Sequence, residues 1–132
     1  MPLVNLRIAA APDRELAARA AAIVHRHTVE QLGKQPDLIA IAVDFVDPAT
    51  WFVAGHALAD SGKRSFALEI KVTDETNTKP EKARFIASVF ASFEQLFGPL
   101  HEESYIHVHD ARAASYGYGG RTQEWRYQRF PA

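Results

Sequence analysis

The sequence has no cysteine among its 132 residues, and this absence removes whole classes of chemistry. Disulfide bonds, thiolate catalysis and zinc sites built from cysteine are excluded, and the chain needs no oxidising compartment to fold. The chain also has no large excess of positive or negative charge, since 15 Lys and Arg against 16 Asp and Glu give a formal net charge of -1. This balance gives no electrostatic reason to expect nucleic acid or a membrane surface as a partner.

Long hydrophobic runs are absent as well. The longest uninterrupted apolar stretch, residues 38–43, is far shorter than the roughly 20 residues that cross a bilayer. The first residues alternate between apolar and polar side chains, whereas a signal peptide has a basic start and a continuous apolar segment. We therefore expect a soluble, cytoplasmic protein with a single domain over residues 1–132.

The chain repeats one pattern of strand, helix, strand and glycine turn, with the second copy about 65 residues after the first. The first copy covers residues 2–56 and the second residues 65–120. In the first copy, alternation of side chains predicts a strand over residues 3–9, and apolar residues at four-residue spacing predict a helix over residues 13–32. An apolar, β-branched run predicts a further strand over residues 38–46.

The second copy repeats these elements. A strand is predicted over residues 65–72, and the pattern Thr78-x-x-Glu81 is typical of a helix capping box. A last alternating run predicts a strand over residues 104–110. Because each parallel crossover is right-handed, both helices are expected on one face of a four-stranded mixed sheet. The fold class is therefore α/β, more narrowly α+β, built from tandem duplicated β-α-β units.

Two features favour a closed homo-oligomer. The sheet face opposite the helices is expected to stay bare and apolar, which favours a partner surface. The C-terminal residues 121–130 alternate large side chains and are predicted to form a strand that reaches a neighbouring subunit. Their Arg, Trp and Tyr content is also typical of single-strand nucleic acid binding, but the near-neutral net charge favours the intersubunit strand.

Several motifs resemble those of a known family. Met1-Pro2 leads directly into a predicted strand, and a β-α-β unit of half the chain length is duplicated. Further motifs are Gly33-Lys34-x-Pro36-x-x-Ile39-Ala40, and Tyr105-Ile106-x-x-x-Asp110 followed by Ala113-Ala114 and Gly117. On these residues the chain resembles, over nearly its full length, the tautomerase superfamily of 4-oxalocrotonate tautomerase and macrophage migration inhibitory factor.

The resemblance implies a cofactor-independent tautomerase or isomerase that acts on a small 2-keto or 2-hydroxy-dienoate carboxylic acid, as a homotrimer with one site per chain. It implies Pro2 as the general base once Met1 is removed. A proline at the true N-terminus is a secondary amine, and desolvation and nearby cations lower its pKa toward neutrality. With Met1 retained, the same nitrogen is a tertiary amide without basicity. The alternative is a purely structural role, in which Pro2 rigidifies the start of the first strand.

The resemblance also implies residues that bind the substrate carboxylate. Lys34 matches the active-site lysine of macrophage migration inhibitory factor, Tyr105 matches its tyrosine, and His107 stands where that protein has asparagine. Arg14 lies near the position of a catalytic arginine in 4-oxalocrotonate tautomerase. Each has a structural alternative: Lys34 is a cation at a helix C-terminus, and Tyr105 is a sheet aromatic at a subunit contact.

Other candidates come from the residues themselves. The second arginine of 4-oxalocrotonate tautomerase falls near Ala40 and is missing, which argues against that substrate itself. Replacement cations are available in Arg112, Lys71 and Arg121, although an exposed charge is usually only solvated. Phe52, Tyr118 and Tyr116 are expected to form apolar walls of the site. The alternative for these aromatic side chains is packing in the core or at an interface.

Three alternatives remain open at this stage. Protonated Pro2 would act as an acid in a hydratase, dehalogenase or decarboxylase, and His27 lies near the helical histidine of cis-3-chloroacrylic acid dehalogenase. That enzyme's arginine pair and glutamate have no clear match here. A non-catalytic trimeric binding protein would keep Pro2 as a relic. A metal site is not expected, because His107 and His109 share a strand face but have no assured third ligand.

Overall fold

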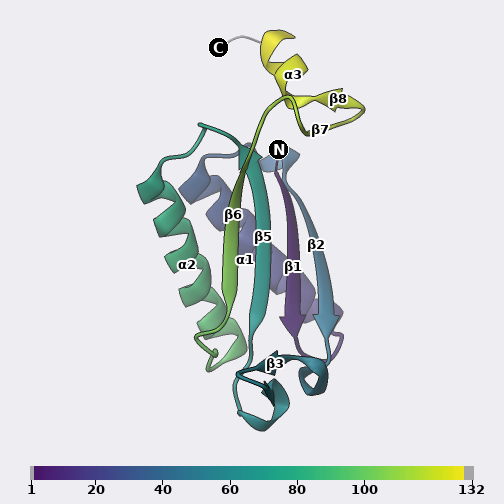
Figure 1. The fold of residues 1–132 in the computed structure, drawn as a ribbon, viewed down its shortest axis with the longest axis vertical. Helices are drawn as coiled ribbons and strands as arrows, with labels where there is room; N and C mark the ends of the chain where they lie inside the picture. The colour runs from purple at the N-terminus through teal and green to yellow at the C-terminus, as the bar shows by residue number, and fades with distance from the viewer. Residues whose placement is uncertain (1, 130–132) are drawn as a thin grey trace.

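A four-stranded sheet with two helices on one face forms the body of the molecule (Figure 1). The computed structural model describes residues 2–129. The strand order is β2-β1-β5-β6, with β1 (Leu3–Ala9), β2 (Ala40–Val46), β5 (Phe66–Thr73) and β6 (Tyr105–Ala111). Each outer strand runs parallel to its neighbour, whereas the central strands β1 and β5 are antiparallel. The predicted mixed sheet and α+β class are confirmed.

The two helices occupy matching places in the two units. Helices α1 (Arg14–Leu32) and α2 (Lys79–Phe97) each have 19 residues, and their corresponding ends are 65 residues apart. The carboxylate of Asp13 caps α1 by accepting from two backbone N–H groups, and Gly33 ends it at φ 67°. The capping box of Thr78 and Glu81 starts α2 as the sequence predicted. Within residues 2–129, no helix combines the length and apolar character needed to cross a membrane.

The core lies between the sheet and the two helices. Alternate side chains of the central strands point to the helices and are fully buried, among them Leu6 of β1 and Leu68 of β5. On α2, the buried Phe93 ring meets Phe66 of β5 edge to face, with ring centroids 4.8 Å apart. This packing fixes the central strands, and with them the point at which the chain enters β1.

The opposite sheet face, here called the uncovered face, is bare as predicted but is not apolar. Figure 1 looks onto it, with α1 behind the sheet. Its middle carries polar and charged side chains, namely Asn5, Arg7, Asp44, Glu69, Lys71, His107 and His109. The prediction of an apolar bare face was wrong because the alternating strands turn their apolar residues toward the helices, which leaves the polar set outside.

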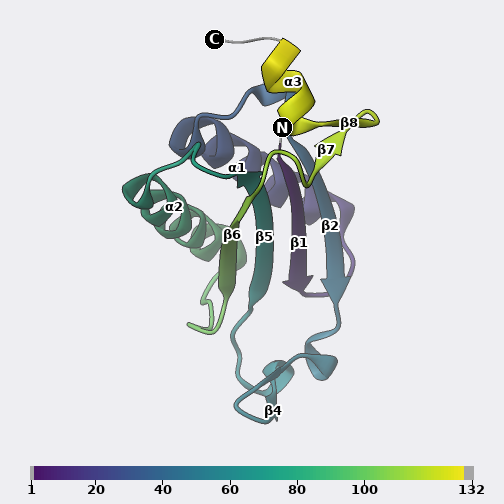
Figure 2. The same ribbon diagram turned by 45° about the horizontal axis from the view of Figure 1, so that its top comes forward.

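A short hairpin lies at each end of the sheet. One consists of β3 (Phe52–Val53) and β4 (His56–Ala57), and the other of β7 (Gly117–Tyr118) and β8 (Arg121–Thr122). Figures 1 and 2 show β7 and β8 beside the N-terminus and the first hairpin at the far end. Three short 3-10 turns complete the fold: Pro36–Leu38, Pro48–Thr50 and Leu58–Asp60.

The C-terminal segment forms a helix, α3 (Gln123–Arg129), and not the predicted strand over residues 121–130. The guanidinium groups of Arg121 in β8 and Arg129 in α3 lie over the Trp125 ring at 4.7 and 4.8 Å, and the second contact uses the four-residue spacing of the helix. The hydroxyl of Thr122 accepts from the Trp125 N–H and caps the first turn. Residue 130, the end of the predicted strand, and Met1 lie outside the described residues.

Candidate active site

A pocket of about 590 Å³ opens at the end of the sheet where β1 begins. Pro2 is buried immediately before β1 and lines this pocket. Its carbonyl oxygen accepts a 3.1 Å hydrogen bond from the Ala40 N–H, which continues the pairing of β1 with β2. We name it the Pro2 pocket, and its lining residues are Pro2, Leu3, Asp37, Leu38, Ile39, Ala40, Lys71, Tyr116, Gly117 and Tyr118.

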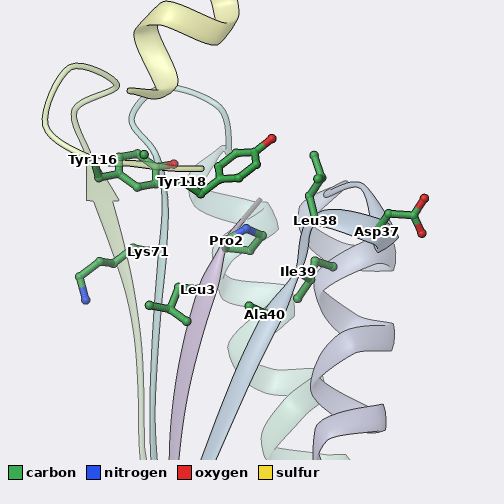
Figure 3. Close-up of a pocket in the computed structure, with 10 residues that line it drawn as sticks. Pro2, Leu3, Asp37, Leu38, Ile39, Ala40, Lys71, Tyr116 and Tyr118 are labelled. Atoms are coloured by element: carbon green, nitrogen blue, oxygen red, sulfur yellow. The ribbon is translucent and has the colours of Figure 1, made fainter. Parts of the chain in front are cut away.

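The β7 hairpin forms the roof of the Pro2 pocket. Figure 3 shows the Tyr118 ring above Pro2, and Tyr116 beside it. The phenol of Tyr116 is hydrogen-bonded to the Thr73 hydroxyl at 2.5 Å, which ties the hairpin to the end of β5. Burial raises the pKa of Tyr116, so this phenol is neutral at physiological pH. The roof is therefore an aromatic, uncharged surface.

One cation and one anion stand at the pocket edge. Lys71 of β5 lies opposite Leu3 in the strand pairing, and Figure 3 shows its ammonium group turned away from Pro2. Asp37, in the 3-10 turn before β2, turns its carboxylate outward. The floor and sides between them are apolar, with Leu3 and Ile39 among the lining residues. An organic acid can thus place its carboxylate toward Lys71 and its carbon chain against the apolar walls.

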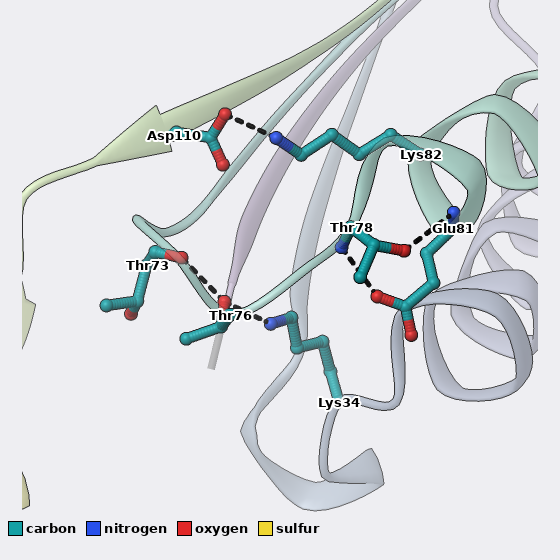
Figure 4. Close-up of polar contacts among 7 residues, drawn as sticks. All are labelled: Lys34, Thr73, Thr76, Thr78, Glu81, Lys82 and Asp110. Atoms are coloured by element: carbon teal, nitrogen blue, oxygen red, sulfur yellow. Dashed lines mark hydrogen bonds and ion pairs between the residues drawn. The ribbon is translucent and has the colours of Figure 1, made fainter.

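Lys34 lies close by in the sequence but does not line the Pro2 pocket. Its ammonium group donates to the Thr76 hydroxyl at 3.0 Å, and that hydroxyl donates to the Thr73 carbonyl at 2.5 Å (Figure 4). Burial lowers the pKa of Lys34, and the carboxylates of Glu81 and Asp110 partly oppose this shift. In this chain Lys34 ties the end of α1 to the loop before α2, and its substrate-binding role stays a prediction.

Tyr105, Phe52 and Arg14 lie at the opposite end of the sheet from Pro2. Tyr105 opens β6 opposite Ala67, while β1 opens opposite the other end of β5. Its phenol donates to the Glu103 carboxylate, and its side chain is 63% exposed. Arg14 is the first residue of α1, which follows the far end of β1. A single chain therefore does not bring these predicted residues to Pro2.

Tyr105 and Phe52 line a second pocket of about 570 Å³, here called the far pocket. Its other lining residues are Trp51, Val53, Ala54, His101 and Glu103. The Glu103 N–H donates to Nδ1 of His101 at 3.0 Å, and the Glu103 carboxylate accepts from the Tyr105 phenol, so this pocket combines aromatic rings with a carboxylate.

The remaining predictions also fall outside the Pro2 pocket. His107 lies in the middle of the uncovered face opposite Glu69, with its ring centroid 5.7 Å from that of His109. Arg112 follows β6 and is exposed without lining the pocket. Of the predicted site residues, the structure brings together Pro2 and Tyr118, with Lys71 and Tyr116 from the wider set of candidates.

The sequence reasoning missed the wall formed by Asp37 and Leu38. The run over residues 38–46 was predicted as continuous strand, whereas β2 begins at Ala40 after a 3-10 turn that starts at Pro36. A proline in the first position of such a turn was the available signal.

Histidines do not form a metal centre in the described part of the chain. His25 bonds the Pro36 carbonyl at 3.0 Å and His27 bonds the Ser92 hydroxyl at 2.8 Å, so the two rings diverge. Within residues 2–129, no group of three or more His, Asp or Glu side chains is placed to hold a metal ion.

Comparison with solved structures shows the same architecture over nearly the whole chain. Pt0534 inactivated by 2-oxo-3-pentynoate has a TM-score of 0.81 at 14% identity, covering 94% of this chain and 98% of that chain. Native fused 4-OT gives 0.80 at 16% identity, covering 93% and 97%. The macrophage migration inhibitory factor homologue from Prochlorococcus marinus gives 0.74 at 18% identity, covering 91% and 97%.

Sequence comparison adds no closer relative: no protein-family model matches the chain, and no curated protein matches it. At 14–18% identity the structural likeness establishes the fold and leaves the chemistry to the site. The chain has the fold that the fused 4-OT and macrophage migration inhibitory factor structures share.

Proposed function

We propose that this protein is a cofactor-independent keto-enol tautomerase of a small 2-keto or 2-hydroxy-dienoate carboxylic acid, with Pro2 as general base. The observation that carries the proposal is the burial of Pro2 in an apolar pocket of about 590 Å³, at the start of the first strand of this fold. Pockets of that size are typical for small-molecule ligands. The proposal requires that Met1 is removed, so that Pro2 is a secondary amine.

The chemistry follows from an amine in an apolar site. Leu3, Ile39 and Tyr118 surround Pro2 with mostly apolar surface. Burial in such surroundings disfavours the protonated form of an amine and so lowers the pKa of that amine. The neutral amine takes the proton of the 2-hydroxyl group of an enol or dienol. It then returns that proton to a carbon of the conjugated chain, which yields the 2-keto acid. No electrons are gained or lost, so the reaction needs no redox partner.

The substrate is an anion with a flat carbon chain. Lys71 is the cation at the pocket edge, and the Tyr118 roof suits a conjugated plane. Neither feature favours a large or highly charged ligand. The missing arginine near Ala40 argues for a substrate with fewer carboxylate contacts than 4-oxalocrotonate has.

The active unit in this proposal is a homotrimer. Fused 4-OT structures with similar folds are trimers. A neighbouring copy would cover the bare sheet face and would bring its Tyr105 and His107 toward Pro2, which a single chain does not do. Mixing chains tests this: Pro2→Ala and Tyr105→Phe chains, refolded together, regain activity only if a site combines Pro2 of one chain with Tyr105 of another. Lack of recovery in mixed trimers would place each site within one chain.

The first experiment is mass spectrometry of the purified protein, followed by ketonisation of phenylenolpyruvate and 2-hydroxymuconate by the native chain and by Pro2→Ala. Loss of Met1 together with activity that disappears in the variant supports the proposal. A processed chain that ketonises neither substrate contradicts it and favours acid catalysis by protonated Pro2, or a binding function. An Arg19→Ala chain, changed on the outer face of α1, is the matched control.

A further inference from the structure

One side chain of α3 contacts the roof of the Pro2 pocket at two points. The guanidinium carbon of Arg126 lies 3.8 Å from the centroid of the Tyr118 ring. Nη2 of the same guanidinium donates a 2.8 Å hydrogen bond to the Tyr118 carbonyl. Arg126 therefore holds both the ring and the backbone of Tyr118, and a planar guanidinium suits this double contact better than an ammonium group does.

The hairpin leaves room for this contact. A Cβ atom added at Gly119, which has φ +61°, would lie 2.9 Å from Nη2 of Arg126. A Cβ atom added at Gly117 would lie 1.8 Å from the Arg121 carbonyl oxygen. A side chain at Gly119 would push the guanidinium away from the hairpin, whereas one at Gly117 would push β7 and β8 apart. Gly117 thus lets the hairpin close, and Gly119 lets the Arg126 guanidinium of α3 approach it.

The contact is partly withdrawn from water. Nε of Arg126 is buried and has no hydrogen-bond partner among residues 2–129, so part of its hydration is given up to reach Tyr118. The other arginines of this segment differ, because Arg121 and Arg129 lie over Trp125. Arg129 therefore provides a matched control, with the same charge on the same helix but without contact to the roof.

We propose that Arg126 is a positioning residue that holds Tyr118 over Pro2 and so sets the shape of the substrate pocket. The residue itself does not line the pocket and acts through Tyr118. Within residues 2–129, Tyr118 is held by its pairing with Arg121 in the hairpin and by the two contacts from Arg126. The kinetic part of this inference rests on the proposed tautomerase function, whereas the positioning of the ring does not.

The geometry is tested by hydroxyl-radical footprinting read at Tyr118 by peptide mass spectrometry. Arg126→Ala should raise oxidation of Tyr118 about threefold, because the ring loses its covering cation. Arg126→Lys should fall between the two, and Arg129→Ala should match the wild type. Gly119→Ala keeps Arg126 but displaces its guanidinium, and should act in the same direction as Arg126→Ala. Unchanged oxidation in Arg126→Ala, or equal effects of Arg126→Ala and Arg129→Ala, would overturn the proposal.

The consequence for the pocket is tested with steady-state kinetics on phenylenolpyruvate. Arg126→Ala should raise KM about tenfold with a much smaller change in kcat, since substrate binding and not the proton transfer loses its support. In a Tyr118→Ala background the same substitution should have no further effect, because the residue through which it acts is gone. A full additional effect, or an unchanged KM, contradicts the proposal. If the wild type turns over neither substrate, the proposed function fails, and footprinting alone decides whether Arg126 positions Tyr118.

Discussion

The two ends of the sheet follow the same plan but offer different chemistry. Each end has a pocket of similar size, about 590 Å³ and 570 Å³, beside an aromatic hairpin. Leu3 lies opposite Ala40 at one end, and Ala67 lies opposite Tyr105 in the matching pair at the other. The position of Pro2 thus corresponds to that of Phe66, which is fully buried in the core. The two pockets are alike in size and place, but Pro2 precedes the first strand at one end and the fully buried Phe66 stands at the matching position at the other.

The charged groups at the two ends differ as well. The Pro2 pocket has Lys71 at its edge, whereas the far pocket contains Glu103 hydrogen-bonded to Tyr105. The hydrogen bond to Glu103 and its negative charge raise the pKa of Tyr105, which keeps the phenol protonated. A carboxylate substrate is repelled by Glu103 and attracted by Lys71. Of these two pockets, the Pro2 pocket has the cation that the proposed organic-acid substrate calls for.

The largest expected effect tests whether the amine makes this difference. Pro2→Ala should lower kcat/KM for phenylenolpyruvate by about 100-fold or more, since positioned acid-base groups contribute at least that much. Stopped-flow or steady-state absorbance of the enol measures it, with circular dichroism to show that the fold is kept. A variant with wild-type kcat/KM would remove Pro2 from the mechanism.

Phe66, the counterpart of Pro2, should affect stability and not the site. Phe66→Ala removes a ring that is fully buried against Phe93, and should lower the free energy of unfolding by about 3–5 kcal/mol. Urea unfolding followed by fluorescence gives this value. The comparison variant is Phe52→Ala, whose side chain is 64% exposed, with an expected change within about 0.5 kcal/mol. Equal losses in the two variants would show that the far end is not packed as described.

The charge difference between the two ends predicts a smaller effect on substrate binding. Lys71→Ala should raise KM for 2-hydroxymuconate about three- to tenfold, and added salt should reduce this difference because the charges are near solvent. The matching residue at the other end is Arg7, opposite Ala67 in the sheet. Arg7→Ala should raise KM less. A larger effect from Arg7 would mean that the substrate carboxylate lies farther along the uncovered face.

The smallest expected effect concerns the contact between the two units. His27 of α1 bonds Ser92 of α2, and burial, with a further contribution from Arg26, lowers its pKa below the ordinary 6.5, while Glu30 opposes this. The unfolded chain then binds the proton more readily than the folded one. Stability should therefore fall as pH drops through 6.5 toward the lowered pKa, by less than about 1.4 kcal/mol per pH unit.

His27→Gln should flatten this dependence, which is measured as urea midpoints at a series of pH values from about 7.5 down to about 5. His25→Gln is the control, because that ring bonds a loop carbonyl at the surface of α1. An unchanged slope in His27→Gln would assign the pH dependence to other groups.

Local signals in the sequence predicted the helices and strands well. Asp13, Gly33 and the capping box at Thr78 act through hydrogen bonds to nearby backbone, so the helix bounds were correct within a residue. The C-terminal helix was missed because alternation of large side chains over residues 121–130 does not reveal that Trp125 and Arg129 stack at the four-residue spacing of a helix. The segment carries both the alternation typical of a strand and the four-residue spacing typical of a helix, and the stacking contacts favour the helix.

The candidate site was only partly predictable for a topological reason. Pro2 was found because the chemistry of an N-terminal proline can be argued from one residue. Tyr105 and Arg14 were grouped with it by resemblance, yet the antiparallel pairing of β1 with β5 puts them at the other end of the sheet in one chain. Lys71 and Tyr118 come to Pro2 from strands 69 or more residues away in the sequence, where no local pattern records the contact.

The sequence alone determined the duplicated β-α-β plan, the four-stranded mixed sheet and the position of Pro2, because hydrophobic periodicity and helix caps act over a few residues. The tertiary structure decided which of two similar pockets holds the proline, which cation stands beside it, and that Arg126 holds its roof. These contacts join residues far apart in the chain, and their distances depend on how the strands pair and where the hairpins close.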